Sequence, residues 1–188
     1  MTGYEAEVNG VRLFVCSSPA LFSPRGLDRG TALMLAHADI RPGMKLLDLG
    51  CGTGVVGAYA AKCGAQVWMS DVSPEAVETA AQTMAENHVS AEKIIVSDAF
   101  DAIDEAGFDC ILCNPPYHTD FAVARRMIEK GFNRLKIGGA MTLVVKRELW
   151  YRKKLESIFG GVRVLRADGY ALLTAERRQA SYARTAKR

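Results

Sequence analysis

The chain has 188 residues, of which 49% are hydrophobic and 24% are charged, and its formal net charge is +3. This composition is typical of one globular domain with a substantial core, and it argues against a disordered chain or two full-sized domains. No apolar run approaches the length of a membrane span and no signal peptide is visible, so the sequence predicts a cytoplasmic protein with no membrane partner.

The first forty residues are predicted to form a hairpin, a loop and a helix. Strands over 5–8 and 11–15 flank Asn9-Gly10, a strong signal for a two-residue turn. Residues 17–26 are rich in serine and proline and predict a loop, and a helix is expected over about 28–38.

Strands and helices then alternate along the chain. Near-continuous apolar strands separated by helices predict an α/β fold with a Rossmann-like, doubly wound, mostly parallel seven-stranded sheet and helices on both faces. We expect one domain over 1–176, in which 1–40 supplies the hairpin and a helix, and a flexible basic tail over 177–188. The predicted strands lie near 45–50, 66–71, 93–97, 109–113, 140–146, 162–168 and 170–175, and the remaining helices near 54–63, 74–87, 119–136 and 148–158.

The five cysteines lack the spacing of a disulfide framework, which favours free thiols in a reducing compartment. Cys110 and Cys113 form a C-x-x-C, but residues three apart on a strand point to opposite faces, and no second pair accompanies them. The sequence therefore predicts no metal site.

A glycine-rich loop follows the strand predicted at 45–50. Glycines at 50, 52 and 54 permit a tight turn and a close approach of the backbone to a ligand, and the next helix supplies N–H groups. The following strand ends on Asp71, which is positioned to accept hydrogen bonds from ribose hydroxyls. Because residues 52–57 also match the dinucleotide pattern G-x-G-x-x-G, a nicotinamide oxidoreductase stays an alternative here.

The tetrapeptide Asn114-Pro115-Pro116-Tyr117 directly follows an apolar strand. Proline cannot continue a central strand, so the segment predicts a rigid loop with an amide, free carbonyls and an aromatic ring side by side. Such a set suits a planar group that carries an NH2 donor, although an isolated tetrapeptide of this kind is more often an ordinary turn. The carboxyl ends of parallel strands share one edge, so the glycine loop, Asp71, Asp98 and Asn114 are expected to form one active site.

These residues carry a resemblance to a known family. The run Asp48-Leu-Gly-Cys-Gly-Thr-Gly54 resembles the first motif of class I S-adenosylmethionine-dependent methyltransferases, and Asn114-Pro-Pro-Tyr117 resembles the motif of their amino-methylating branch. The resemblance implies S-adenosyl-L-methionine as cofactor and an exocyclic amine or a glutamine amide as acceptor. It places Gly50, Gly52 and Gly54 under the methionine part of the cofactor, Asp71 at its ribose, and Asp98 and Ala99 beside its adenine.

More narrowly, the chain is similar to the small methyltransferase domain group that includes the guanine-N2 methyltransferases of small-subunit ribosomal RNA. His118 follows the tetrapeptide as in that group, although Tyr117 stands where the group commonly has phenylalanine. Leu21-Phe-Ser23 and Leu27-Asp-Arg-Gly-Thr31 resemble its segment ahead of the sheet, so Asp28 is a candidate for the cofactor's amino-acid end, or simply a helix cap. The resemblance covers about residues 11–176.

The catalytic residues expected from this reasoning are Asn114, Pro115 and Tyr117. The Asn114 side-chain oxygen and the Pro115 carbonyl would accept the two hydrogens of an amine and turn its lone pair toward the methyl group. Tyr117 would stack on a planar acceptor, or else pack in the core, and Asn114 is also a cofactor-binding candidate. His118 would take the departing proton or would be an ordinary surface histidine. Asp48 is expected to bond the glycine loop or the cofactor's ammonium group.

Basic residues favour RNA as the partner. Clusters of this kind contact phosphates, or form ordinary solvated faces and chain ends. The function predicted from the sequence is methylation of guanine N2 in ribosomal RNA. The alternatives are methylation of a protein glutamine and a non-catalytic cofactor-binding RNA assembly factor. The basic residues concerned are Lys146, Arg147, Arg152, Lys153 and Lys154, and in the tail Arg177, Arg178, Arg184, Lys187 and Arg188.

Overall fold

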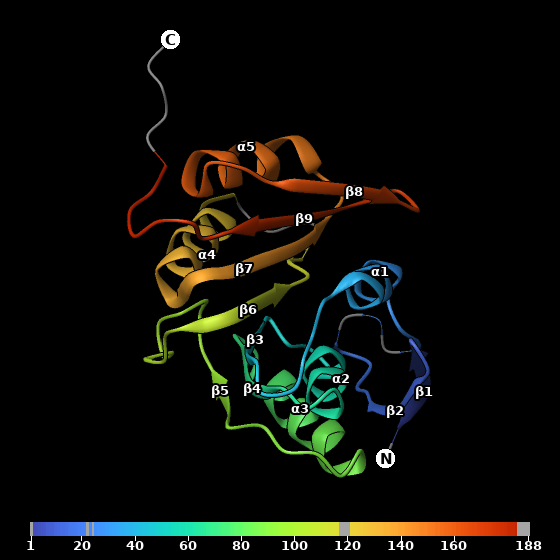
Figure 1. Cartoon of the computed structure of the whole chain (residues 1–188). Helices are drawn as coiled ribbons and strands as arrows, with labels where there is room; N and C mark the ends of the chain where they lie inside the picture. The colour runs from blue at the N-terminus through green and yellow to red at the C-terminus, as the bar shows by residue number, and fades with distance from the viewer. Residues whose placement is uncertain (1, 22, 24, 117–120, 184–188) are drawn as a thin grey trace.

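The N-terminal hairpin forms as predicted. The computed structural model describes residues 2–21, 23, 25–116 and 121–183, and Figure 1 shows their arrangement. Strands β1 (Gly3–Val8) and β2 (Val11–Cys16) pair antiparallel. Asn9 and Gly10 connect them with φ angles of 49° and 79°, which is the conformation of a two-residue turn that suits the twist of a hairpin.

The main sheet has seven strands in the order β5-β4-β3-β6-β7-β9-β8. Strands β3 to β7 run parallel, and only β9 pairs antiparallel, with both β7 and β8. The chain moves outward from β3 in one direction and restarts on its other side with β6, so the switch point of this doubly wound sheet lies between these two strands. The strands are β3 (Lys45–Leu49), β4 (Gln66–Asp71), β5 (Lys93–Val96), β6 (Phe108–Cys113), β7 (Leu135–Val145), β8 (Arg163–Ala167) and β9 (Tyr170–Glu176).

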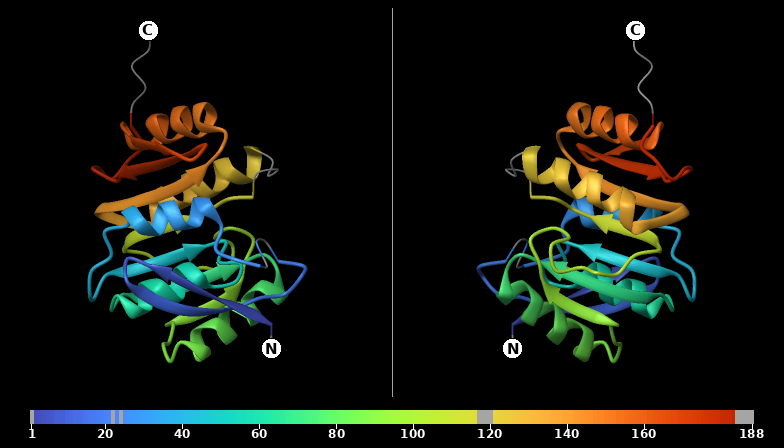
Figure 2. Two further views of the ribbon diagram at one scale, coloured as in Figure 1. Left: turned by 90° about the vertical axis from the view of Figure 1, so that its right-hand side faces the viewer. Right: turned by 90° about the vertical axis from the view of Figure 1, so that its left-hand side faces the viewer.

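Helices cover both faces of this sheet, as the sequence predicts (Figure 2). The core on one face includes buried side chains of α1 (Arg29–His37), α2 (Val55–Lys62) and α3 (Pro74–Glu86). The core on the other face includes those of α4 (Phe121–Arg134) and α5 (Glu148–Phe159). Burial of both faces explains why the parallel strands read as continuous apolar runs.

The hairpin is docked on α3 by hydrogen bonds between side chains and backbone. The Phe14 N–H donates to Asn87 Oδ1 at 3.1 Å, and Asn87 Nδ2 donates to the Phe14 carbonyl at 2.6 Å. The Cys16 N–H donates to Thr83 Oγ1 at 3.1 Å. Helix side chains thus satisfy an edge of a short hairpin, and they fix its position beside the sheet.

The expected boundary between α4 and β7 is wrong. A helix was predicted to run to residue 136 and a strand to begin at 140, but α4 ends at Arg134 and β7 begins at Leu135. Leu135 pairs with Phe108, and a register shift follows on β6 before Cys110 pairs with Ala140. Leu135 is therefore held by its pairing with Phe108, and Gly138 and Gly139 by backbone hydrogen bonds with Arg177. Local propensity does not reveal such distant partners.

The first part of the predicted tail packs against the domain. Arg177 places its guanidinium 4.8 Å from the ring centre of Phe132, and the Tyr182 ring meets the same phenylalanine edge-on at 5.0 Å. The Ala183 N–H donates to the Ile158 carbonyl at 2.9 Å. Residues 177–183 thus lie against α4 and α5, and the last five residues of the chain lie outside the described part.

Cys110 and Cys113 contribute to cores on opposite faces of the sheet, as predicted for residues three apart on a strand. All five cysteines are free thiols. Among the described residues, no helix is both long and apolar enough to cross a lipid bilayer.

Candidate active site

The glycine loop wraps around the end of β4. The Gly50 N–H donates to the Ser70 carbonyl at 2.8 Å, and the Gly52 N–H donates to Asp71 Oδ2 at 2.9 Å. The other oxygen of Asp71 accepts from the Ser73 N–H at 3.0 Å. Asp71 therefore ties the loop to the start of α3, and its carboxylate still has lone pairs to offer a ligand.

Gly54 has a packing role in this loop. Its φ of 80° lies in the left-handed region at the N-cap of α2, and a Cβ here would lie 2.7 Å from the Ala80 Cα. Only glycine lets α2 start this close to α3. Gly54 is not part of the cavity lining, whereas Gly50 and Gly52 are.

Asp48 is buried, with 3% of its surface exposed, and its Oδ2 accepts from the Gly57 N–H at 3.0 Å. The hydrogen-bond donor to Asp48 thus lies in the first turn of α2, and not in the glycine loop that the sequence analysis had suggested as a partner. Burial raises the pKa of Asp48 to about 7, the Gly57 bond works against this, and the nearby Asp71 charge adds to the rise. Asp48 also lines the cavity described below.

The raised pKa makes a prediction about stability. Below about pH 4 a carboxyl is protonated both folded and unfolded, but between about 4 and 7 only the unfolded chain releases the proton. The free energy of unfolding of the wild type should therefore fall with rising pH by up to about 1.4 kcal/mol per pH unit, compared with that of the Asp48→Asn variant. Asparagine is the reference because it never ionises and can still accept the hydrogen bond from Gly57. Urea unfolding at a series of pH values measures this difference.

The matched control is Asp104→Asn, which changes an exposed carboxyl in the same way. It should follow the wild-type pH dependence. Parallel curves for the wild type and Asp48→Asn would contradict the assignment of a raised pKa to Asp48.

Asn114 follows β6 and is tied to the segment that precedes the sheet. Its Nδ2 donates to Asp28 Oδ2 at 3.0 Å and to Thr31 Oγ1 at 2.9 Å. Asp28 also caps α1, because its Oδ2 accepts from the Thr31 N–H at 2.9 Å. Sequence reasoning missed Thr31, although its place in the run Asp-Arg-Gly-Thr was a signal.

Asp98 and Ala99 lie at the end of β5. The Ser97 N–H donates to the Asp71 carbonyl at 2.8 Å, which brings this turn against the end of β4. Asp98 is exposed and pairs with Arg126 of α4, while Ala99 adopts a φ of 51°. No sequence signal pointed to Arg126.

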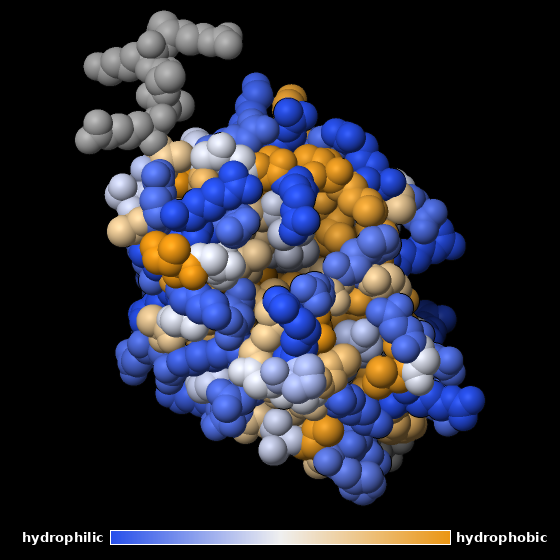
Figure 3. Space-filling view, in the orientation of Figure 1, coloured by the Kyte–Doolittle hydropathy of each residue, from blue (hydrophilic) through white to orange (hydrophobic). Residues whose placement is uncertain are grey.

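These elements enclose a cavity of about 530 Å³, a volume in the range of small-molecule sites. It opens where the carboxyl ends of the strands meet. In Figure 3 the largest group of apolar side chains on the visible face lies in the upper half of the view, where Figure 1 draws α5, β8 and β9. The predicted site residues that line the cavity are Asp28, Asp48, Gly50, Gly52, Asp71, Asp98, Ala99, Asn114 and Pro115. Tyr117, predicted as catalytic, lies outside the described residues, as does His118.

Tyr4, Val72 and Met127 are among the lining residues that the sequence did not anticipate. Tyr4 reaches the cavity from the hairpin, where burial raises the pKa of its hydroxyl and a hydrogen bond from Thr53 opposes the rise. Val72 and Met127 add apolar surface, and 67% of the Val72 surface is exposed. The hairpin gives no sequence signal for Tyr4, because its proximity to the cavity depends on docking against α3.

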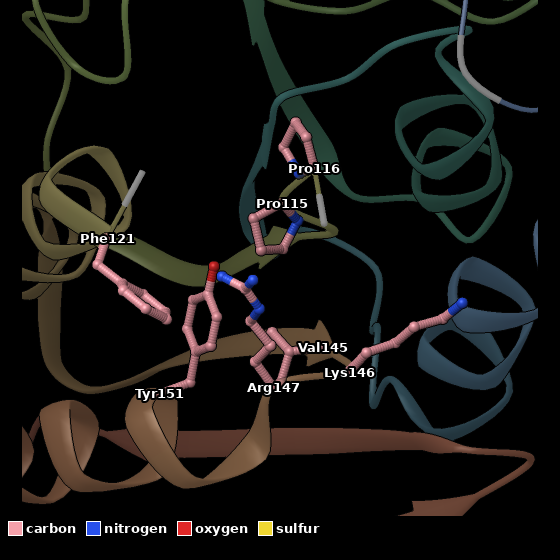
Figure 4. Close-up of a pocket in the computed structure, with 7 residues that line it drawn as sticks. All are labelled: Pro115, Pro116, Phe121, Val145, Lys146, Arg147 and Tyr151. Carbon is pink, nitrogen blue, oxygen red and sulfur yellow. The ribbon is translucent and has the colours of Figure 1, made fainter. Parts of the chain in front are cut away.

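A second, smaller cavity of about 20 Å³ adjoins the first at Pro115 and Pro116 (Figure 4). Arg147 extends toward Pro115 beside the Tyr151 hydroxyl, and its guanidinium lies 5.3 Å from the ring centre of Phe121. Burial raises the pKa of Tyr151 to about 12, and the Arg147 charge opposes the rise. The two prolines therefore separate a large cavity from a smaller one with aromatic walls and a cation.

Comparison with known proteins identifies the family. The model of the methyltransferase small domain family matches residues 12–174. The chain is 36% identical over 172 residues to the ribosomal RNA small subunit methyltransferase C of Pseudomonas paraeruginosa, an alignment that covers 88% of this chain and 51% of that protein. It is 36% identical over 163 residues to the Haemophilus influenzae protein of the same name, with coverage of 84% and 49%.

A solved structure agrees with these relatives. The T. thermophilus 16S rRNA N2 G1207 methyltransferase, in complex with AdoMet and guanosine, superposes with a TM-score of 0.85 and 30% sequence identity. The superposition covers 94% of this chain and 50% of that one. The chain thus spans about half the length of the relatives it matches. Together, the family match, the identities and the superposition show that the chain belongs to the methyltransferase small domain family.

Proposed function

We propose that this protein transfers a methyl group from S-adenosyl-L-methionine to N2 of guanine in ribosomal RNA. One observation carries the proposal: Asn114 and Pro115 line the large cavity at the switch point of the sheet, and Pro115 also lines the small cavity with the Arg147 cation. Pro115 thus lies between the large cavity, which suits a cofactor, and the hollow beside Arg147. The relatives named for methylation of ribosomal RNA support this assignment.

The large cavity fits the cofactor in both size and chemistry. Asp71 accepts from the Gly52 N–H of the glycine loop and from the Ser73 N–H at the start of α3, and it keeps lone pairs for ribose hydroxyls. The Ser70 hydroxyl lines the same cavity, is 1% exposed, and has no hydrogen-bond partner within the described chain, so it suits a polar ligand. When bound, the cofactor supplies an activated methyl group on its sulfonium.

The acceptor side of the site orients an amine. The lone pair of an exocyclic amine is delocalised into the attached ring, so the nitrogen is a poor nucleophile until it is turned out of the plane. The Asn114 Oδ1 and the Pro115 carbonyl are the acceptors that would hold its two hydrogens. Pro115 is buried and rigid, and this preorganises the site before the acceptor arrives.

Cations near the acceptor side favour RNA over a protein glutamine. Lys146 and Arg147 follow β7 and line the small cavity, and Arg152 and Lys153 are exposed on the next helix, α5. Phosphate groups bind such residues without regard to sequence, in a manner that salt weakens. A glutamine side chain would gain nothing from them.

The test incubates the purified chain and isotopically labelled S-adenosyl-L-methionine with small ribosomal subunits, naked 16S rRNA or a release factor in separate reactions. We expect label in RNA, recovered as N2-methylguanosine after nuclease digestion and mass spectrometry. Label in a glutamine of the release factor would replace this proposal with protein methylation. Cofactor binding without transfer to any of the three would favour a non-catalytic assembly factor.

Calorimetry separates these outcomes from the dinucleotide alternative. The chain should bind S-adenosylhomocysteine and show no heat with NADH. Binding of NADH alone would overturn the proposal.

A further inference from the structure

The side-chain amide of Asn114 has a fixed direction. A carboxylate only accepts hydrogen bonds, so the Asn114 atom that lies 3.0 Å from Asp28 Oδ2 must be the amide nitrogen. The second hydrogen of that nitrogen meets Thr31 Oγ1 at 2.9 Å. With both hydrogens engaged, Oδ1 is the end of the amide that remains to accept from a ligand.

The partners of Asn114 are themselves held in place. Asp28 Oδ2 caps α1 by accepting from the Thr31 N–H at 2.9 Å, and the Thr31 hydroxyl lies 3.4 Å from the same oxygen. Tyr170 of β9 donates from its hydroxyl to the other oxygen, Asp28 Oδ1, at 3.4 Å. Helix α1 in turn is anchored by Met34 and Leu35, both fully buried.

The glycine between them makes this arrangement possible. A Cβ at Gly30 would lie 2.9 Å from the Tyr170 ring and 3.0 Å from Asp28 Oδ2. The run Asp28-Arg-Gly-Thr31 therefore supplies a cap, a space for Tyr170 and a hydroxyl for Asn114. Asp28 and Thr31, which these contacts hold in place, are the two residues that bond the Asn114 amide.

We propose that Asp28 and Thr31 are positioning residues that lock the rotation of the Asn114 amide, so that Oδ1 and not Nδ2 faces the acceptor amine. The inference rests on the proposed function, because it concerns the same site. The terminal torsion of asparagine is broad and roughly two-fold, so an unsupported amide samples both orientations. In the flipped orientation the Asn114 NH2 group would face the N–H groups of the acceptor amine, so that amine would lose Oδ1 as a hydrogen-bond acceptor. This assigns Asp28, which also lines the large cavity, a role toward Asn114.

Thr31→Val tests the lock, since valine keeps the buried shape and removes the hydroxyl. We expect kcat to fall by about 10- to 100-fold, the range that a misplaced reactive geometry costs. Affinity for S-adenosylhomocysteine should stay within about twofold, because valine keeps the shape of this residue in the cavity lining and the lost hydroxyl is one that bonds Asn114. Thr31→Ser restores the hydroxyl and should recover most of the rate. The control is Thr79→Val, which makes the same change at a buried threonine of α3 outside both cavities.

A second readout does not depend on activity. In the 15N–1H spectrum of the protein without cofactor, the Asn114 NH2 signals are assigned by their loss in Asn114→Ala. Thr31→Val should shift one of the two proton signals and speed its exchange with water, and Thr31→Ser should restore it. Unchanged amide signals in Thr31→Val, or wild-type kcat in that variant, would overturn the proposal. If the wild-type protein transferred no methyl group, the proposed function would fail, while the amide signals would still test the lock.

Discussion

Asn114→Ala is expected to lower kcat by about 100- to 1,000-fold, the cost of losing one preorganised hydrogen-bonding group in an active site. The variant keeps the Pro115 carbonyl but removes the side-chain oxygen that, in our proposal, accepts the second amine hydrogen. Affinity for S-adenosylhomocysteine should change by less than about threefold, because both Asn114 donors bond protein groups, Asp28 and Thr31. Single-turnover methyl transfer and calorimetry measure the two quantities separately.

The matched control is Asn133→Ala, which removes an exposed asparagine from α4. It should leave both quantities at wild-type values. Asn114→Asp adds a second test, because it would place a carboxylate against that of Asp28 and should be at least as inactive as alanine. Loss of cofactor binding in Asn114→Ala would show that this residue serves the cofactor and not the acceptor.

The sequence predicted most of this fold because the main signals are local. The hairpin turn at Asn9-Gly10, the apolar strands and the glycine loop each depend on a few adjacent residues, and the structure shows each in place. The start of β7 was not predictable in this way. Leu135 and Lys136 are good helix formers, and Leu135 belongs to the strand through its pairing with Phe108, far back in the chain.

The site shows the same division between local and distant signals. Gly50, Gly52, Asp71 and Asn114 come directly at or after strand ends, where a sheet of this topology collects its ligands. Tyr170, by contrast, is 142 residues from its partner Asp28. Only the antiparallel return of β9 beside β7 brings them together, so no pattern in the sequence could show it.

The glycine motif divides into two physical roles. Gly50 and Gly52 line the cavity, so absence of a side chain leaves room for a ligand. Gly54 and the buried Asp48 instead hold the start of α2 against its neighbours. A motif that reads as one binding signature is therefore partly a packing device, and substitutions within it should divide into losses of affinity and losses of stability.

Asp71→Ala is the substitution expected to weaken cofactor binding most. Asp71 is the acidic side chain at the end of β4 that lines the cavity and also holds the Gly52 and Ser73 N–H groups. Hydrogen bonds to a charged group contribute about 1.5–3 kcal/mol each, so loss of two bonds to ribose hydroxyls should raise the Kd for S-adenosylhomocysteine by at least about 100-fold. Calorimetry measures the Kd, and thermal unfolding measures the accompanying loss of stability.

The control for charge is Glu78→Ala, which removes an exposed carboxylate of α3 outside the cavity. The Kd of this variant for S-adenosylhomocysteine should match the wild-type value, because salt screens a solvent-exposed charge that does not line the cavity. A Kd for Asp71→Ala within about threefold of the wild-type value would contradict a ribose contact. Asp71 would then act only on the backbone of the loop, and the change would appear in the free energy of unfolding. In our proposal the same carboxylate serves both purposes, so we expect affinity and the free energy of unfolding to fall together.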